Sequence, residues 1–413
     1  MNYELIDQGA ITSAEIISNA QPYWVGVERA IDFLEGFDEH TVLHSGPPIE
    51  YCDMCELHKR GMRNAALFEG LAKTEEEAEG MILSGKIKIR SAFDFNTVGS
   101  GVGIISASVP LIVCEDRSTG IRAGVFPHES KFGGGFCGWG VFSEAIKENL
   151  LYIGNKLFAP ISEILSENGG IPLKSIIAEA LTMGDENHSS QNAADALFIR
   201  SVIPVALKCS NSDELLSYFA DTPRFFHNFC QSASRAAMLG AHNVSHSPVI
   251  TAAGGNGVEY GIKVSGLSEQ WFTAPSPMIK GTYMTPGATQ ESQLPWIGDS
   301  SIVECAGLGG IASAASPKVC SYRGENYVDG ISTTERMRLI CASENRSYVI
   351  PNLKYKATPV GIDVLKVKNE GILPVINGGM IDKNGGWMGA GCAEIPYECF
   401  AKACEAFEEK YSR

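Results

Sequence analysis

Four segments in the middle of the chain carry apolar residues at intervals of three and four positions: residues 154–170, 171–184, 193–208 and 222–241. This spacing gathers apolar side chains on one face of a helix. The proline and glycine residues between the segments are typical of helix ends. The pattern therefore predicts a helical domain over residues 151–245.

The chain on either side of this helical region carries segments typical of strands. Residues 86–90 alternate between polar and apolar positions, and short apolar runs occupy residues 259–266, 348–355 and 371–378. Runs of this length and pattern predict strands with one buried face. Helices and strands are therefore mixed along the chain.

Two further helices complete the predicted elements. A capped helix is expected over residues 74–84, and an amphipathic helix with Pro396 in its first turn closes the chain. We therefore expect an α+β (mixed α/β) fold, in which α/β domains over residues 1–150 and 246–413 flank the helical domain.

Composition narrows the class of protein. A chain of 413 residues that is 44% hydrophobic can bury a large core, and a formal net charge of −15 argues against nucleic acid or an anionic membrane as partner. The most apolar run, residues 102–114, falls short of the ~20 residues that a bilayer requires. The first residues lack the pattern of a secretion signal. We therefore expect a cytoplasmic protein.

The 12 cysteines are spread along the chain, which is typical of free thiols in a reducing compartment. Cys52, Cys55 and His58 stand at spacings that could supply three metal ligands, but no second Cys or His pair nearby completes a four-ligand structural site. We predict no metal site there.

Glycine-rich runs are the first candidates for ligand binding. Gly99, Gly101 and Gly103 free the backbone to expose its N–H groups to an anion or a carbonyl, although a tight turn with close packing explains them equally well. Asp299 and Ser300 open a second such run, where they could cap a helix or hold a substrate amide.

The segment 181–200 concentrates polar chemistry between two apolar stretches. If a helix begins near Asp185, that residue is a plausible N-cap and Glu186 suits the positive end of the helix dipole. A continuing helix would also align Asp185, His188 and Asn192 on one face, where they could orient and protonate a small polar substrate. The acids and the histidine could instead bind a divalent cation, although the H-E-x-x-H spacing is absent. These alternatives stay open.

The chain resembles the YlbE/YahG-like family of bacterial proteins in blocks that span nearly its whole length. Many members of that family are proteins of unknown function, and one branch is a subunit of oxamate carbamoyltransferase, which converts oxalurate and phosphate to oxamate and carbamoyl phosphate in allantoin degradation. The blocks that carry the resemblance are residues 43–51, 67–78, 96–116, 181–188, 256–275, 298–317 and 360–391.

The resemblance implies a mixed fold of two α+β domains and a helical one, in agreement with the pattern above. It also implies a place in an oligomeric complex with an FdrA-type, acyl-CoA-synthetase-like subunit and possibly a third subunit. The expected ligands are a small amide or carboxylate and phosphate or carbamoyl phosphate, with no further cofactor.

The predicted site joins the residues above to others in the same blocks. We expect Asp185, Glu186 and His188 to be catalytic and to manage the amide proton, while the glycine-rich loop stabilises charge on the carbamoyl oxygen and cradles phosphate. The expected substrate-binding residues are His44, Asn96, Gly99, Gly101, Gly103, Asn192, Trp271, Asp299 and Ser300.

Other functions fit the same sequence. The chain could act on a related small amide, or serve as a non-catalytic scaffold for the FdrA-type subunit, or work alone as an amide hydrolase or lyase. The S-T-R-T-R motif of ordinary transcarbamylases is missing, and so is the G-x-S-x-G motif of serine hydrolases.

Overall fold

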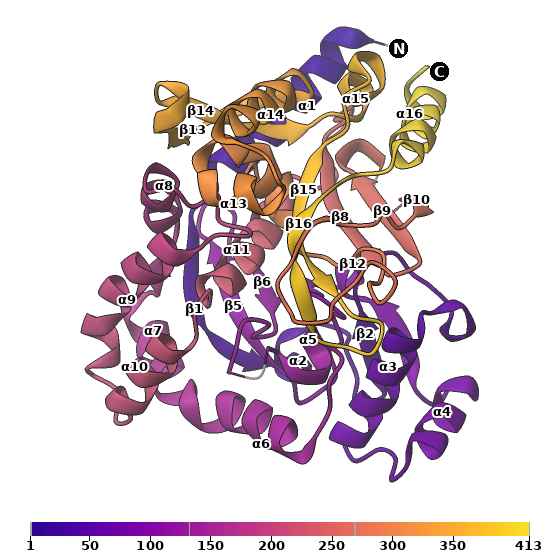
Figure 1. The fold of residues 1–413 in the computed structure, drawn as a ribbon, viewed down its shortest axis with the longest axis vertical. Helices are drawn as coiled ribbons and strands as arrows, with labels where there is room; N and C mark the ends of the chain where they lie inside the picture. The colour runs from indigo at the N-terminus through magenta and orange to yellow at the C-terminus, as the bar shows by residue number, and fades with distance from the viewer. Residues whose placement is uncertain (1, 132, 268–269, 413) are drawn as a thin grey trace.

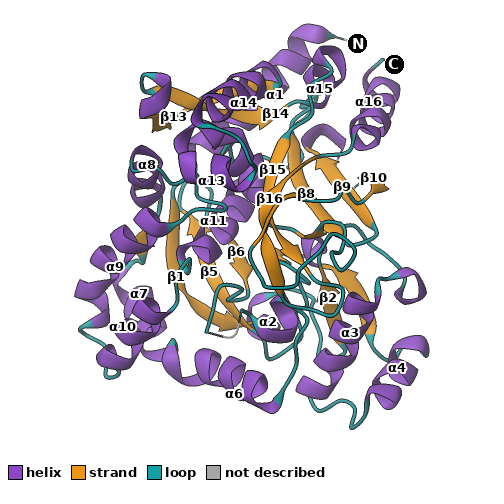
Figure 2. Ribbon diagram, viewed as in Figure 1, coloured by secondary structure: helices purple, strands orange, loops and turns teal. Residues whose placement is uncertain are grey.

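The computed structural model describes residues 2–131, 133–267 and 270–412. Helices and strands are mixed along the whole chain (Figures 1 and 2), which confirms the predicted α+β class. The largest sheet has the strand order β4-β6-β5-β1-β7. Its strands are β1 (Pro22–Arg29), β4 (Thr97–Val98), β5 (Pro110–Asp116), β6 (Ile121–Val125) and β7 (Ile171–Pro172).

The C-terminal half adds two more sheets. One has the order β10-β9-β8-β12 and the other the order β11-β16-β15. Their strands are β8 (Ile250–Asn256), β9 (Glu259–Val264), β10 (Trp271–Pro275), β11 (Lys280–Tyr283), β12 (Ile297–Gly298), β15 (Val375–Ile381) and β16 (Trp387–Glu394). Two-stranded sheets pair β2 (Thr41–His44) with β3 (Lys88–Ser91) and β13 (Cys341–Ile350) with β14 (Lys356–Ile362).

The segments predicted as helices in the middle of the chain are helical. After α6 (Glu144–Tyr152), the chain forms α7 (Ala159–Asn168), the short strand β7, α8 (Lys174–Thr182), α9 (Asn192–Ala206), α10 (Ser212–Asp221) and α11 (Phe226–Gly240). An aromatic cluster joins these helices to the first sheet, because the buried indole of Trp24 on β1 packs against Phe198 at 5.8 Å and Phe229 at 5.0 Å between ring centroids. Each such pair adds about 0.5–1.5 kcal/mol beyond the area it buries.

Contacts cross both predicted domain boundaries. The short β7 pairs with β1, and α1 (Tyr3–Asn19) packs against β13 and β14 near the other end of the chain. Figure 1 accordingly shows the N- and C-termini at the same end of the molecule. The division into units ending at residues 150 and 245 stays a prediction.

The remaining helices lie at the periphery or near the site. They are α2 (Ala30–Phe33), α3 (Glu56–Phe68), α4 (Glu75–Leu83), α5 (Gly135–Gly138), α12 (Ile302–Cys305), α13 (Pro317–Tyr322), α14 (Tyr327–Leu339), α15 (Val364–Glu370) and α16 (Tyr397–Tyr411). The Thr74 side chain accepts a hydrogen bond from Glu77 N at the start of α4, as predicted, while Pro396 caps α16 and does not lie inside its first turn. No helix in the described ranges joins sufficient length to sufficient apolar character to cross a membrane.

Candidate functional site

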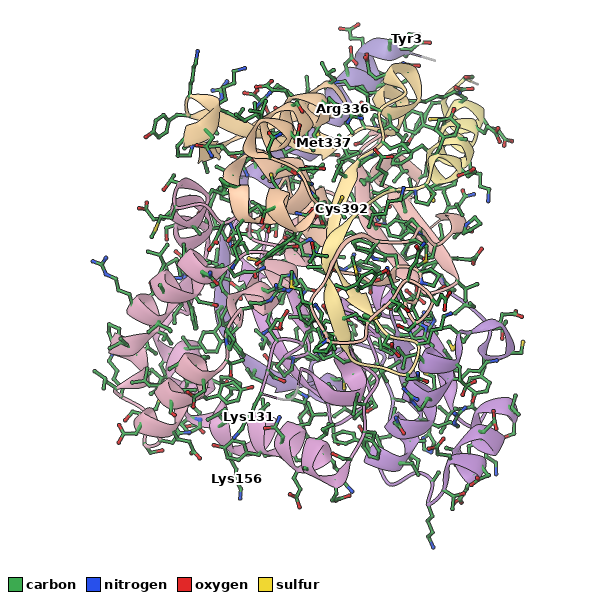
Figure 3. All side chains as sticks on the ribbon, viewed as in Figure 1. Tyr3, Lys131, Lys156, Arg336, Met337 and Cys392 are labelled. Carbon is green, nitrogen blue, oxygen red and sulfur yellow. The ribbon has the colours of Figure 1, made fainter. Side chains whose placement is uncertain are left out.

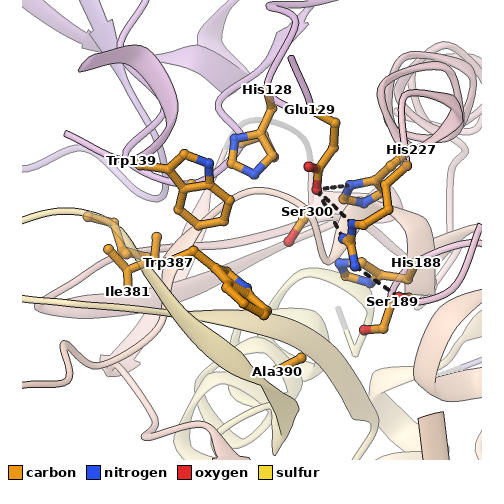
Figure 4. Close-up of a pocket in the computed structure, with 15 residues that line it drawn as sticks. His128, Glu129, Trp139, His188, Ser189, His227, Ser300, Ile381, Trp387 and Ala390 are labelled. Carbon is orange, nitrogen blue, oxygen red and sulfur yellow. Dashed lines mark hydrogen bonds and ion pairs between the residues drawn. The ribbon is translucent and has the colours of Figure 1, made fainter. Parts of the chain in front are cut away.

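A small cavity of about 30 Å³ lies where several separate parts of the chain meet, and we call it the inner pocket (Figure 4). Its walls come from the glycine-rich loop, the segment after β6, the loop before α9 with the start of α11, and strands β15 and β16. The polar side chains that line it include Ser100, His128, Glu129, His188, Arg224 and His227.

His188 is the member of the predicted catalytic set that lines the inner pocket. Its Nδ1 lies 2.8 Å from Oε1 and 2.9 Å from Oε2 of Glu304, a residue of α12. Because a carboxylate only accepts hydrogen bonds, Nδ1 carries the hydrogen, and Nε2 is the atom available to a ligand. Burial disfavours the charged imidazole, but the charge and hydrogen bond of Glu304 outweigh it and raise the pKa of His188.

Glu304 is itself held in place by the backbone. Its Oε1 also accepts hydrogen bonds from Gly310 N at 2.9 Å and from Asn377 N at 3.0 Å, and the side chain is fully buried. A fixed carboxylate sets both the tautomer and the orientation of the imidazole it bonds. His188 and Glu304 therefore have the arrangement of a base and its orienting acid.

Asp185 and Glu186 build the loop that carries His188. Glu186 accepts hydrogen bonds from the backbone N–H groups of residues 188, 189 and 190, and burial raises its pKa to about 7. Asp185 Oδ2 accepts from the N–H groups of Ala193 and Ala194, at 2.5 and 3.0 Å, and so caps α9. Asp185 is not the N-cap residue that was predicted, because Gln191 holds that position, but its carboxylate accepts hydrogen bonds from the first turn of α9.

The shared helical face predicted for this segment is wrong. The helix α9 begins at Asn192, and residues 185–191 form a loop. Asp185, His188 and Asn192 therefore do not lie along one helix. The loop forms because the buried Glu186 carboxylate satisfies its backbone N–H groups and Asp185 satisfies those of the helix that follows, and hydrophobic periodicity does not predict either contact.

Arg224 and Glu129 form a partly buried ion pair on the same wall. Glu129 Oε1 accepts from Arg224 Nη2 at 3.0 Å and lies 3.8 Å from His227 Nδ1. Burial alone would raise the pKa of Glu129, but the Arg224 guanidinium holds it well below the usual range. Burial lowers the pKa of His227 to about 3, so this imidazole is neutral at pH 7.

Arg224 has a left-handed backbone, with φ of +68°, which costs energy in a residue other than glycine. The carboxylate of Asp195 holds this conformation, because it accepts from Arg224 N at 2.6 Å and from Phe226 N at 2.8 Å. The guanidinium in turn donates to Ser189 O at 2.9 Å. The strained backbone therefore points the guanidinium toward the loop that carries His188.

Ser100 and His128 contribute polar groups to the inner pocket that have no hydrogen-bond partner among the described residues. The His128 ring packs on Trp139 with 4.4 Å between centroids, and burial lowers its pKa to about 4. Gly101 makes room for this ring, since a Cβ there would lie 2.9 Å from His128 Cε1 and 2.4 Å from Gly138 O.

The other wall of the pocket is the sheet of β15 and β16. Trp139 and Trp387 both pack over Gly379, where an added Cβ would lie 3.5 and 3.3 Å from their rings. Ala390 of β16 also lines this wall. Small residues on the strands therefore allow two indoles to converge at the edge of the pocket.

A wider space of about 450 Å³, which we call the outer basin, adjoins the inner pocket and opens to solvent. The two share Glu129, Trp139, Arg224 and Trp387. The residues particular to the outer basin include Lys131, Asn192, Thr222, Met284, Lys318 and Tyr322.

The predicted substrate-binding residues fall into three groups. Gly101 and Ser300 line the inner pocket and Asn192 the outer basin. His44, Asn96 and Trp271 lie elsewhere: His44 lines a groove beside β3, Asn96 borders a separate hollow, and Trp271 packs on Phe93 at 5.8 Å. The third group is Gly99, Gly103 and Asp299.

The residues of this third group hold the backbone of the glycine-rich loop in its conformation. Asp299 accepts hydrogen bonds from Gly46 N at 2.7 Å and Gly99 N at 2.9 Å, and burial raises its pKa to about 8. Gly103 N donates to Cys137 O. These N–H groups are therefore engaged within the protein and fix the shape of the loop.

Several pocket residues escaped the analysis of the sequence: Glu129, His128, Trp139, Arg224, His227, Glu304 and Trp387. Of these, Glu304 is the residue that the sequence could have indicated, because an acid inside the apolar run 302–308 needs a buried partner. Among the described residues, no group of three or more His, Cys, Asp or Glu side chains is placed to hold a metal ion.

Comparisons with known proteins agree with the resemblance. The family model described as "Oxamate carbamoyltransferase subunit AllG" matches residues 87–300. The oxamate carbamoyltransferase subunit AllG of Escherichia coli (strain K12) is 33% identical over 404 residues, which cover 96% of each chain. The uncharacterized protein YahG of the same organism is 32% identical over 403 residues, which cover 96% of this chain and 85% of YahG.

The fold has an experimental counterpart. The crystal structure of a conserved protein of unknown function from Enterococcus faecalis V583 superposes with a TM-score of 0.92 at 30% identity and covers 99% of both chains. Taken with the match to AllG over nearly the full length, this shows that the chain belongs to the family of the oxamate carbamoyltransferase subunit AllG.

Proposed function

We propose that this chain is the subunit of an oxamate carbamoyltransferase-like complex that supplies the proton-handling pocket of the reaction. The reaction is oxalurate and phosphate to oxamate and carbamoyl phosphate. The observation that carries the proposal is His188, which lines the inner pocket with Glu304 fixed behind it.

The chemistry of the reaction requires such a group. A phosphate oxygen attacks the terminal carbamoyl carbon of oxalurate, and the bond from that carbon to the oxamate nitrogen breaks. An amide anion is a poor leaving group, so the departing nitrogen needs a proton as the bond breaks. His188 Nε2 donates it, and the proton of the attacking hydrogen phosphate restores the imidazolium. Glu304 stabilises that positive charge throughout.

Arg224 suits the anionic end of the substrate. Its guanidinium lines both the inner pocket and the outer basin, and a planar guanidinium binds a carboxylate or phosphate through parallel hydrogen bonds. Glu129 already occupies one edge of the guanidinium and holds the group in position. We place the oxalurate carboxylate near Arg224 and the scissile nitrogen near His188.

The complex is part of the proposal because AllG is named as a subunit. The partners would be the FdrA-type protein and a third subunit encoded with it. Asp185 and Glu186 then act as positioning residues, since their carboxylates hold the loop of His188.

The test is phosphate-dependent release of oxamate and carbamoyl phosphate from oxalurate, measured with this chain alone and with its co-encoded subunits. We expect turnover in the reconstituted mixture and a loss of about 10²-fold or more in His188→Gln, with assembly unchanged. His40→Gln is the matched control, because His40 is exposed. Full activity of His188→Gln would indicate that the chain is a non-catalytic scaffold. No turnover in any mixture would exclude this reaction.

A further inference from the structure

The polar groups of the inner pocket fall into a charged set and a neutral set. Glu129, Arg224 and His188 carry charge or acquire it easily, and they adjoin one another through Ser189 and His227. Ser100 and His128 are uncharged; Ser100 belongs to the glycine-rich loop, and His128 directly precedes Glu129 in the chain. Figure 4 shows His128 beside Trp139, and His188 beside His227 and Ser189.

The neutral set is unsatisfied. Ser100 is 1% exposed and His128 4% exposed, and neither the Ser100 hydroxyl nor Nδ1 of His128 forms a hydrogen bond with any of the described residues. Buried polar side chains are otherwise nearly always hydrogen-bonded, so two orphans lining one cavity point to a ligand. Burial keeps the His128 ring neutral at pH 7, since it lowers its pKa to about 4.

The chemistry of these two groups selects a ligand class. A neutral imidazole offers one donor and one acceptor, and a hydroxyl offers both. A primary carboxamide has the complementary set, with its NH₂ as donor and its carbonyl as acceptor. A carboxylate has acceptors alone and would leave the acceptor nitrogen of His128 facing an anion.

We propose that Ser100 and His128 are specificity-determining residues that bind the carboxamide end of a small amide acid whose carboxylate lies at Arg224. The inner pocket then prefers a monoanion with one neutral amide end over the corresponding diacid. Glu129 adds to this preference, because a second negative charge near its carboxylate is repelled. The inference rests on the proposed function only in taking the inner pocket as the substrate site.

The test compares succinamate and succinate, which repeat the spacing between the carboxylate and the terminal carboxamide of oxalurate and differ by an NH₂ in place of an oxygen. Their binding to the purified full chain, and to the reconstituted complex, is measured by calorimetry. We expect the wild type to prefer succinamate by about tenfold or more, which corresponds to about 1.4 kcal/mol. Ser100→Ala and His128→Phe are each expected to reduce that preference, with succinate affinity changed little.

Two further variants keep the test decisive. His128→Asn retains a donor and an acceptor and is expected to keep part of the preference, which a merely structural role for the ring would not produce. His40→Gln is the surface control. Equal binding of the two ligands by the wild type, or an equal loss of both in Ser100→Ala, would overturn the inference.

Failure of this inference differs from failure of the proposed reaction. If no mixture cleaves oxalurate but the wild type prefers succinamate and Ser100→Ala does not, the specificity is supported and the reaction is excluded. If cleavage depends on His188 but Ser100→Ala leaves the preference unchanged, the reaction stands and the specificity falls.

Discussion

The imidazole of His188 stacks on that of His227, with 5.0 Å between ring centroids and 27° between ring planes. The two rings share a wall of the pocket but differ in charge. Glu304 raises the pKa of His188, whereas burial lowers that of His227 to about 3. His188 is therefore the ring that can hold a proton at neutral pH.

The pH profile of oxalurate cleavage depends on this proton. Cleavage uses protonated His188, so the rate is expected to fall as pH rises through the raised pKa of that residue. Glu304→Gln removes the charge that raises it, and the falling limb is expected to move to lower pH while kcat drops about 10²-fold. The measurement is kcat against pH for both proteins. A falling limb at the same pH in both would contradict the pairing of His188 with Glu304.

The stability of the fold carries a second pH dependence, from Glu186. Its folded pKa of about 7 lies above the ~4.3 expected when unfolded, so the native state binds a proton that the unfolded chain releases. The free energy of unfolding therefore gains from Glu186 as pH falls from about 7 toward ~4.3. Glu186→Gln is expected to lose this gain in urea denaturation at pH 5 compared with pH 8. An unchanged difference would contradict the shift.

Removal of the Asp185 cap is expected to destabilise the chain. Asp185→Ala leaves the first N–H groups of α9 without their acceptor, which costs about 1–2 kcal/mol. Chemical denaturation measures the loss, and Asp213→Ala, at the exposed start of α10, is the matched control. A cost no larger than that of the control would show that the cap contributes nothing.

Gly101 is expected to be irreplaceable for activity. Gly101→Ala forces a Cβ into Gly138 O and the His128 ring, and its φ of +60° adds strain. Gly120→Ala has a similar φ of +75° but open space around the new Cβ, so it measures the strain alone. We expect a small loss of stability of about 1 kcal/mol in Gly120→Ala and loss of turnover in Gly101→Ala. Equal behaviour of the two variants would contradict a role for the close packing.

Phosphate is expected to enter through the outer basin. Lys131, labelled in Figure 3, and Lys318 are both exposed on the basin of a chain with a net charge of −15. Lys131→Glu and Lys318→Glu should each lower kcat/KM for phosphate several-fold at low salt, and less at high salt because the charges are screened. Lys86→Glu, an exposed lysine away from the basin, is the control. A loss independent of salt would argue against this route.

The sequence indicated much of the fold and part of the site. Helical periodicity located α7, α8, α9 and α11, because amphipathic helices carry their signal locally. The pairing of β7 with β1 could not be predicted, since two paired residues carry no periodic signal. His188 stood out as a polar residue in a dense cluster, but its partner Glu304 lies 116 positions further along the chain. The pocket residues that were missed come from loops and helix starts that only the tertiary fold brings together.

The wall of the inner pocket that β15 and β16 form has a consequence for how the family diversifies. Gly379 lies beneath both Trp139 and Trp387, so a single methyl group at this position would reach both rings at once. The surrounding strands would keep their hydrogen bonds, because the change alters volume and leaves the backbone pairing of β15 and β16 alone. One substitution at Gly379 could therefore adapt a relative to smaller substrates and leave His188 and Glu304 unchanged. Substrate size and chemical mechanism would then evolve as separate traits of one fold.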